Sequence, residues 1–392
     1  MNLRTLLVGP DHRGGEGAYM GLLRAYPPQG VAYTSVGGHH TGGPGVDCER
    51  VREVALNRLI HPRTNPDMGF RALRLRDRFD LVHVHAHPVH LARLRGTPVV
   101  MSEGSSNAVY LGAYLGWDDE RMERIYRKSR RLYRTLGIRD RLLALDAVER
   151  VYVFSEWARE VKVRWGANPE KLDVVRPGFP VPDPVEREQR DTFTFLFVGT
   201  DFERKGGFDV VEAFDRISVD YPAARLVMVG SDPWTPDPDR SLHAWVSDER
   251  RRRVLARLSE LERQGLARHA QHVDAAVLQD ALYPGADAFV MPTLAEGWGF
   301  TNVEAMSYGL PVISSRVGPI PETLEDGRVG LLVEAGDVDE LAKAMIRLAS
   351  DPATTRRMGQ EGRAEFLRRH TIDDFRVRLG DFYRRTLEGL GT

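Results

Sequence analysis

The sequence predicts an α/β protein with two domains of similar size, each built around a parallel sheet. Short apolar runs typical of buried strands alternate with longer stretches of helical spacing along nearly the whole chain. This alternation is typical of parallel sheets that are covered by helices on both faces. A proline-rich stretch near the middle of the 392 residues separates two such series of elements.

The expected strands fall into two series, one before and one after that stretch. The first comprises residues 3–8, 81–84, 98–101 and 150–154, and the second comprises residues 193–198, 224–229, 271–273, 288–291 and 311–314. The spacing of apolar residues predicts helices at residues 207–221, 242–264 and 338–349, and a final helix near residues 373–390.

The proline-rich stretch extends from Pro177 to Pro184 and contains four prolines. Because proline cannot occupy a helix interior or a central strand, this stretch is expected to be a linker. We therefore predict an N-terminal domain of residues 1–182, a C-terminal domain of residues 183–372, and a last helix within residues 373–392.

Composition excludes several classes of protein. The single cysteine, Cys48, rules out an intramolecular disulfide framework and favours a reducing compartment. Mean hydropathy is −0.37, and no apolar run approaches the roughly 18 residues that a membrane span needs. The N-terminus has a charge within its first apolar run and indicates a buried strand instead of a signal peptide. A cytoplasmic protein is expected.

The charge is unevenly distributed, although the net charge is only −1. Basic residues exceed acidic ones in residues 1–180, and acidic residues are in excess after them. The segment between Arg121 and Arg141 holds nine Lys or Arg residues against two acids. It is either a basic amphipathic helix for peripheral contact with an anionic membrane, or a solvated helix face. No nucleic-acid-binding module is present, so nucleic acid is not an expected partner.

Two glutamates, Glu296 and Glu304, flank the turn Gly297-Trp-Gly299 after an apolar strand. A helix is expected to begin near Thr301 and to carry Glu304 in its first turn. Glycines let backbone N–H groups approach a ligand closely, and a helix N-terminus favours an anion such as phosphate. The pattern suits a ligand with a sugar, a diphosphate and a ribose, but any strand–turn–helix unit with a capping acid could also produce it.

The surrounding segment, residues 294–315, resembles the signature of retaining nucleotide-sugar glycosyltransferases of the GT-B fold, glycosyltransferase family 4 (glycosyl transferases group 1). That family has Glu, seven residues, Glu, then Ala-Met, Gly and Pro-Val, as between Glu296 and Val312. The runs 318–322 and 327–333 extend the match. The resemblance implies two Rossmann-like domains facing each other across a cleft, with the last helix packing back toward the N-terminal domain.

The resemblance also implies an activity. A hexose-type sugar would move from a UDP- or GDP-sugar to an acceptor hydroxyl of a glycan, glycolipid or small molecule, with retention and an α-glycosidic product. Glu296 would orient the sugar and Glu304 would hold the ribose hydroxyls. No Asp-x-Asp metal motif occurs in the cleft segments, so we expect metal-independent transfer without a cofactor. The alternatives are a nucleotide-sugar epimerase or hydrolase of this fold, and a non-catalytic nucleotide-sugar-binding protein.

Arg204 and Lys205 follow the first strand of the second series. Ligands of open α/β sheets bind at the carboxyl ends of strands, where two cations could neutralise a diphosphate. The alternative is a solvated basic turn. The family places its diphosphate clamp in this loop, although some relatives carry an arginine where this chain has Thr200. The resemblance and the helix start together imply the donor contacts Gly14, Gly15, Thr200, Val273, Gly299, Phe300, Thr301 and Glu304.

The N-terminal domain should supply the acceptor side. Period-two spacing puts His83, His85 and His87 on one face of a strand, which could indicate a metal site. The family instead has a histidine that reaches the reacting sugar at the position of His85, and we assign that role. Glu103 and Asn107 follow another strand and are expected to contact the acceptor, or to form an ordinary strand-end turn.

Overall fold

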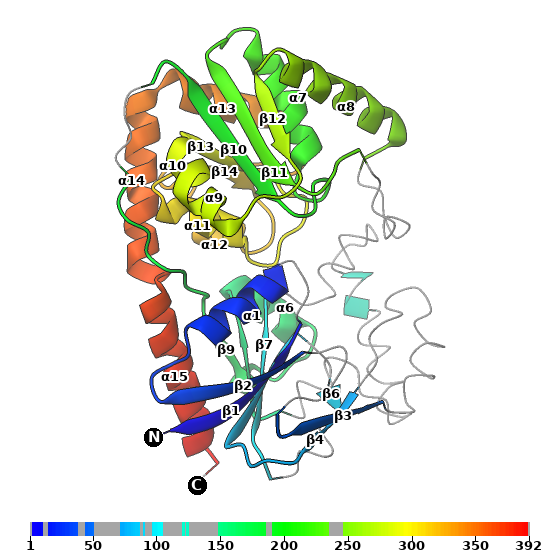
Figure 1. The fold of residues 1–392 in the computed structure, drawn as a ribbon, viewed down its shortest axis with the longest axis vertical. Coiled ribbons are helices and arrows are strands. Elements are labelled where there is room, and N and C mark those ends of the chain that lie inside the picture. The colour runs from blue at the N-terminus through cyan, green and yellow to red at the C-terminus, as the bar shows by residue number, and fades with distance from the viewer. Residues whose placement is uncertain are drawn as a thin grey trace. The chain divides into compact units, whose positions relative to one another are not determined.

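The computed structural model describes residues 2–10, 15–37, 44–50, 71–86, 89–90, 96–104, 120–121, 123–124, 148–185, 190–234 and 246–390. The chain forms two compact units. The N-terminal unit comprises Met1–Phe179 together with Ile372–Thr392, and the C-terminal unit comprises Pro180–Thr371 (Figure 1). The last helix therefore belongs to the unit that contains the start of the chain.

The N-terminal unit contains a six-stranded parallel sheet in the order β2-β1-β5-β7-β8-β9. Its strands are β1 (Leu3–Gly9), β2 (Val31–Gly37), β5 (Leu81–His85), β7 (Val99–Glu103), β8 (Arg150–Val153) and β9 (Leu172–Val174). Every residue of β5 and β7 is buried, as expected for strands covered on both faces. A small second sheet contains β3 (Val46–Arg50), β4 (Arg71–Leu75) and β6 (Val89–His90).

The described helices of this unit are α1 (Gly15–Ala25), α6 (Glu156–Arg164) and α15 (Ile372–Glu388), and a short 3₁₀ turn spans Pro169–Lys171. Ser155 caps α6 by accepting a hydrogen bond from the Ala158 N–H at 3.0 Å. Helix α15 buries Phe375, Leu379 and Phe382, whose spacing of three to four residues places them on one face. The Ile372 N–H donates to the Phe179 carbonyl at 2.8 Å, which fixes the start of this helix to the N-terminal unit (Figure 1).

The C-terminal unit contains a second six-stranded parallel sheet, in the order β12-β11-β10-β13-β14-β15. Its strands are β10 (Phe193–Gly199), β11 (Ala224–Gly230), β12 (Ala267–Ala270), β13 (Ala288–Met291), β14 (Val312–Ser315) and β15 (Gly330–Val333). The long helices are α7 (Gly207–Ser218), α8 (Asp248–Arg263), α11 (Phe300–Ser307), α13 (Val338–Ser350) and α14 (Pro352–Arg369). Short helices are α9 (Ala275–Val277), α10 (Tyr283–Gly285) and α12 (Ile320–Thr323), with a π-helical turn at Leu278–Leu282.

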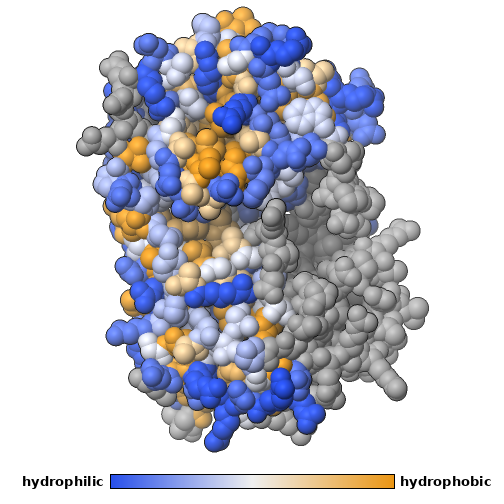
Figure 2. Space-filling model, in the orientation of Figure 1, coloured by the Kyte–Doolittle hydropathy of each residue, from blue (hydrophilic) through white to orange (hydrophobic). Residues whose placement is uncertain are grey.

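The helices of this unit pack in two groups. Helix α7 lies between α8 and α13, and α11 lies beside α14 (Figure 1). Helix α13 buries Leu341, Ala344, Met345 and Leu348, an apolar stripe at helical spacing. In Figure 2, hydrophilic residues cover much of the coloured surface of the molecule, and apolar residues gather on it in patches.

The predicted α/β class with parallel sheets is confirmed, but several elements differ. The strand predicted at residues 271–273 is wrong, because β12 ends at Ala270. The Ala-Arg-His-Ala sequence of β12 is a weak strand signal, and pairing with β11 at the sheet edge determines it. Helix α8 begins at Asp248 behind the cap Ser247, whereas the prediction began at residue 242. Strands β2, β3, β4, β9 and β15 and helix α14 were not predicted.

Candidate active site

Each six-stranded sheet has a topological switch point, where consecutive elements leave in opposite directions. In the C-terminal unit the chain passes from β10 to β11 and β12, and then returns to β13 on the other side of β10. The switch point therefore lies between β10 and β13, which is where open α/β sheets form ligand crevices. The loops after these two strands contain Arg204, Lys205 and Glu296.

The structure brings these three side chains together. The Arg204 guanidinium donates to the Ala295 carbonyl at 2.6 Å and to the Asp201 carboxylate at 2.9 Å. The Arg204 carbonyl accepts a hydrogen bond from the Leu294 N–H at 2.7 Å. Arg204 thus ties the loop after β10 to the loop after β13.

The Lys205 ammonium forms an ion pair with the Glu296 carboxylate. The exposed fractions of the two side chains are 12% and 7%. Burial alone would raise the pKa of Glu296, but the charges of Lys205 and Arg204 outweigh it and hold the pKa at about 2. The other Glu296 oxygen accepts from the Gly297 N–H at 3.0 Å. Glu296 is therefore an anion that neutralises one of two adjacent cations.

Close approach of the two loops depends on Gly206, which has φ +79° and precedes α7. A Cβ atom at this position would lie 2.2 Å from the Pro292 carbonyl oxygen, in the loop after β13. No side chain fits without moving one loop away from the other.

Gly206→Ala is therefore expected to lower the free energy of unfolding by about 2–4 kcal/mol, from the left-handed backbone and the steric contact together. Gly336→Ala is the matched control, because Gly336 has φ +81° but a Cβ atom there would meet nothing within 4 Å. Urea denaturation of both variants measures the two losses of unfolding free energy, and their difference is the cost of the contact with Pro292. Equal losses in the two variants would contradict the steric role of Gly206.

Helix α11 begins directly after the second glycine of the turn. Gly299, at φ +87°, precedes the helix, and its carbonyl accepts the N–H groups of Asn302 at 3.0 Å and Val303 at 3.3 Å. The Thr301 hydroxyl contacts the Met291 sulfur at 3.1 Å. The first helical residue is Phe300, so the positive end of the helix dipole lies at the predicted donor contacts Gly299 to Thr301.

Glu304 is the fifth residue of α11, one residue further from the start of the helix than predicted. Its carboxylate accepts a hydrogen bond from the Tyr283 hydroxyl at 3.1 Å. Burial raises the pKa of Glu304 to about 7, although the Tyr283 hydrogen bond opposes the shift. Tyr283 stacks on Tyr308 with ring centroids 4.9 Å apart. Tyr283 was not singled out from the sequence, because its contact with Glu304 joins separate elements.

Thr200 and Val273 occupy the same edge of the sheet. Thr200 is exposed directly after β10, and Val273 is half-buried three residues after β12. Because all six strands are parallel, both residues lie at the carboxyl edge that also carries Arg204 and Glu296. Their predicted contacts with the donor remain predictions.

The N-terminal unit has its switch point between β1 and β5. Gly15 is the first residue of α1, after β1, while Gly14 lies outside the described residues. His85 ends β5 and is completely buried. Its Nε2 atom lies 2.5 Å from the Glu16 carboxylate, and its Nδ1 atom lies 2.8 Å from the Ser102 hydroxyl. Glu16 was not singled out from the sequence, although an acid in the first turn of a helix at this loop was the available signal.

The other predicted acceptor contacts are Glu103 and Asn107, and their role remains a prediction. Glu103 ends β7, has an exposed fraction of 2%, and forms a buried ion pair with Lys162 of α6. Asn107 and His87 lie outside the described residues. The segment between Arg121 and Arg141 also lies outside them, apart from residues 121, 123 and 124.

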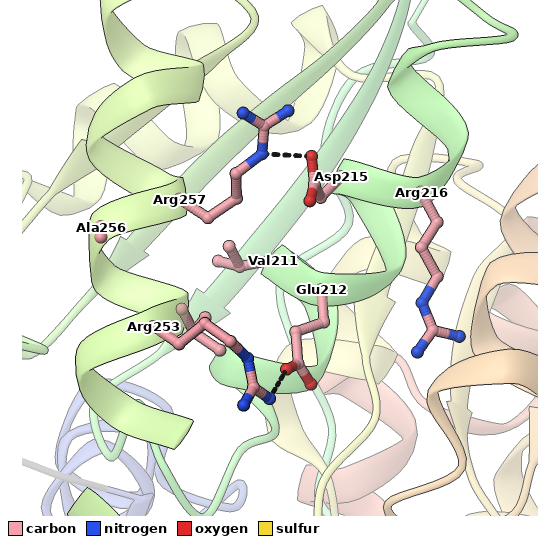
Figure 3. Close-up of a pocket in the computed structure, with 8 residues that line it drawn as sticks. Val211, Glu212, Asp215, Arg216, Arg253, Ala256 and Arg257 are labelled. Atoms are coloured by element: carbon pink, nitrogen blue, oxygen red, sulfur yellow. Dashed lines mark hydrogen bonds and ion pairs between the residues drawn. The ribbon is translucent and has the colours of Figure 1, made fainter. Parts of the chain in front are cut away.

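A separate groove of about 510 Å³ lies between α7 and α8, and none of the predicted site residues lines it (Figure 3). Figure 3 shows two arginines that line it paired with acids of α7, Arg253 with Glu212 and Arg257 with Asp215. These charges are already compensated within the groove.

No helix among the described residues is long and apolar enough to cross a membrane. Within the same residues, no group of three or more His, Cys, Asp and Glu side chains is arranged to hold a metal ion.

Two six-stranded parallel sheets and a final helix that returns to the first unit are the architecture of the GT-B fold. Residues 183–365 match the family model "Glycosyl transferases group 1". This part of the chain is therefore a group 1 glycosyltransferase domain, as the sequence signature predicted.

The chain is similar to curated proteins of this kind. It is 26% identical over 304 residues to a glycogen synthase of Mycobacterium tuberculosis, an alignment that covers 76% of this chain and 65% of the relative. It is 25% identical over 350 residues to a D-inositol 3-phosphate glycosyltransferase of Pseudarthrobacter chlorophenolicus, covering 86% of this chain and 76% of the relative. The chain thus spans less than two thirds of the glycogen synthase.

Solved structures share the fold over nearly the whole chain. Sucrose-phosphate synthase from Thermosynechococcus elongatus matches with a TM-score of 0.67 and 21% identity, covering 99% of this chain and all of that one. The Anabaena protein HepE, in complex with UDP-glucose, matches with a TM-score of 0.63 and 14% identity, covering 98% of this chain and 100% of that one. The predicted GT-B fold is confirmed.

Proposed function

We propose that this glycosyltransferase moves a hexose-type sugar from a UDP- or GDP-sugar to an acceptor hydroxyl, with retention and an α-glycosidic product. The acceptor would be a hydroxyl of a glycan, a glycolipid or a small molecule. The observation that carries the proposal is the cluster of Arg204, Lys205 and Glu296 at the β10/β13 switch point, next to the start of α11.

The cluster has the charges that departure of a nucleoside diphosphate requires. As the sugar–oxygen bond breaks, positive charge develops on the sugar ring and negative charge grows on the leaving diphosphate. Arg204, Lys205 and the N-terminus of α11 would stabilise that negative charge. Because these groups are already held by protein contacts, little reorganisation is needed as the charge develops.

The two glutamates would have separate roles. Glu296, ionised beside Lys205, would accept hydrogen bonds from sugar hydroxyls and orient the ring. Glu304, one turn into α11, would accept from the ribose hydroxyls. The acceptor proton would pass to the departing phosphate on the same face of the sugar, which leaves neither glutamate as a general base.

The N-terminal unit would contribute the acceptor side. His85 would contact the reacting sugar, and Glu103 and Asn107 would contact the acceptor. Glu16, which lies 2.5 Å from His85, joins this set as a group that the structure adds.

The experiment that tests the function measures release of nucleoside diphosphate from UDP-glucose and from GDP-mannose, with and without sugar-phosphate and glycoside acceptors. UDP-glucose is the first donor to test because a protein of this fold is solved with it. Acceptor-dependent release with an α-linked product, identified by NMR, supports the proposal. Donor turnover without acceptor would indicate an epimerase or hydrolase. Binding in calorimetry with no turnover would indicate a binding protein.

Transfer is expected to be independent of divalent metal, since arginine, lysine and a helix N-terminus would supply the charge that a metal supplies elsewhere. The initial rate should stay within about twofold when EDTA replaces magnesium in the assay. Loss of activity in EDTA that returns on adding Mg²⁺ or Mn²⁺ would contradict the expectation. The chelated sample's melting temperature serves as the control for folding.

A further inference from the structure

His85 is the end of a continuous buried chain of hydrogen bonds through the N-terminal unit. The Ser102 hydroxyl lies 2.8 Å from His85 Nδ1 and 2.8 Å from His83 Nε2. His83 Nδ1 lies 2.7 Å from the Tyr383 hydroxyl, which lies 2.8 Å from the Tyr33 hydroxyl. These hydrogen bonds join β5, β7 and β2 to the C-terminal helix α15.

The direction of every bond in this chain follows from its carboxylate end. The Glu16 carboxylate lies 2.5 Å from His85 Nε2, and a carboxylate favours hydrogen on the ring nitrogen that it faces. With hydrogen on Nε2 alone, His85 Nδ1 accepts from the Ser102 O–H. The Ser102 oxygen then accepts from His83 Nε2–H, which leaves His83 Nδ1 as the acceptor for the Tyr383 O–H.

The surroundings keep this arrangement static. Burial lowers the pKa of His83 well below its ordinary value, so His83 is neutral. Burial raises the pKa values of Tyr383 and Tyr33 far above neutral, so neither tyrosine gives up its proton. A proton could pass along these hydrogen bonds to His85 only if a tyrosine at the far end became a tyrosinate. The series of hydrogen bonds therefore orients its members and does not conduct protons.

Other groups enclose these hydrogen-bonded residues. The Tyr152 hydroxyl lies 3.4 Å from His83 Nε2 and 2.5 Å from the Tyr19 hydroxyl. The rings of Tyr19 and Phe154 lie 4.6 Å and 6.1 Å from the His85 ring, between centroids. His85 thus has two polar contacts of fixed position and aromatic neighbours.

We propose that Ser102, His83 and Tyr383 are positioning residues that hold His85 in the Nε2–H tautomer, with its N–H directed to the Glu16 side of the β1/β5 switch point. The role of His85 in transfer rests on the proposed function, whereas its tautomer does not. Helix α15, through Tyr383, becomes part of the catalytic apparatus of the N-terminal unit. The return of α15 to the N-terminal unit thus supplies a residue that helps to orient His85.

The tautomers can be read directly from ¹⁵N NMR of protein labelled in its histidine rings, because protonated and bare ring nitrogens resonate at separate shifts. His83→Gln and His85→Gln variants assign the signals. We expect hydrogen on Nε2 and a bare Nδ1 for both His83 and His85. A hydrogen on His85 Nδ1 in the native protein would overturn the proposal.

Kinetics test the consequence. Ser102→Ala is expected to lower kcat about 10- to 100-fold, and Tyr383→Phe about 3- to 10-fold, with donor KM within about twofold in both. Thr386→Val is the matched control, because the Thr386 hydroxyl is also buried on α15 but donates to the Phe382 carbonyl of its own helix, at 2.8 Å. This control should leave kcat unchanged.

If the Ser102→Ala variant does not fold, Tyr383→Phe alone tests the positioning role. Native kcat in a folded Tyr383→Phe variant with a mixed His83 tautomer would refute the positioning role. Failure of the native protein to transfer sugar would refute the proposed function instead, and the NMR result would still decide the tautomer.

Discussion

Replacing Lys205 by methionine is expected to lower kcat for sugar transfer about 100- to 1000-fold, the usual loss for one preorganised charge at a developing anion. Methionine keeps the length of the side chain but removes the ammonium that would face the leaving diphosphate. It also leaves Glu296 without its ion-pair partner in a site where the Glu296 side chain is only 7% exposed. Steady-state release of nucleoside diphosphate, together with calorimetric affinity for UDP, measures both effects.

The control for this substitution is Lys343→Met, because Lys343 is exposed on α13 and belongs to neither strand-end loop. Its kcat should match that of the native protein. Glu296→Ala should lower kcat much more than it weakens nucleotide binding, since Glu296 is assigned to the sugar and not to the nucleotide. Parallel losses of kcat and nucleotide affinity in Glu296→Ala would contradict that assignment, and native kcat in Lys205→Met would contradict the diphosphate role.

Glu304→Gln is expected to change stability and binding in opposite directions. The pKa of Glu304 is about 7 in the folded chain against an ordinary value of 4.5. Between these values the folded state holds a proton that the unfolded state has lost, so this group makes folding less favourable as pH rises. The variant should therefore be about 1–3 kcal/mol more stable than the native protein at pH 8, with most of the difference gone at pH 5.

The same substitution should weaken binding of UDP at pH 8 by about 10- to 100-fold, the loss expected when hydroxyls no longer donate to a charged acceptor. Native affinity should rise with pH up to about 7, because ribose hydroxyls prefer the ionised carboxylate. Thermal melts at the two pH values and calorimetry with UDP measure these effects. Glu388→Gln, at the exposed end of α15, is the control. A stability difference that is the same at pH 5 and pH 8 would contradict the assignment.

Much of the C-terminal unit was predictable because its signals are local. Strands β10, β11, β13 and β14 are short apolar runs buried on both faces, and such runs are visible in the sequence without knowledge of their neighbours. Strand β12 was misplaced and β15 was missed, since the pairing of edge strands depends on the sheet to which they attach. The turn around Gly299 and the start of α11 were predicted within one residue because glycine and helix periodicity are local signals.

The sequence alone determined the fold class, the positions of most central strands and the residue types of the donor site, because periodicity and turn residues act over a few neighbours. Only the tertiary structure decided which groups share a site. Lys205 meets Glu296 across 91 residues of chain, and Tyr383 meets His83 across 300. Such pairs form when parallel strands align their carboxyl ends and when α15 returns to the first sheet. Burial at those meeting points then sets their charges, which is why Glu296 and Glu304, similar in sequence context, have pKa values of about 2 and about 7.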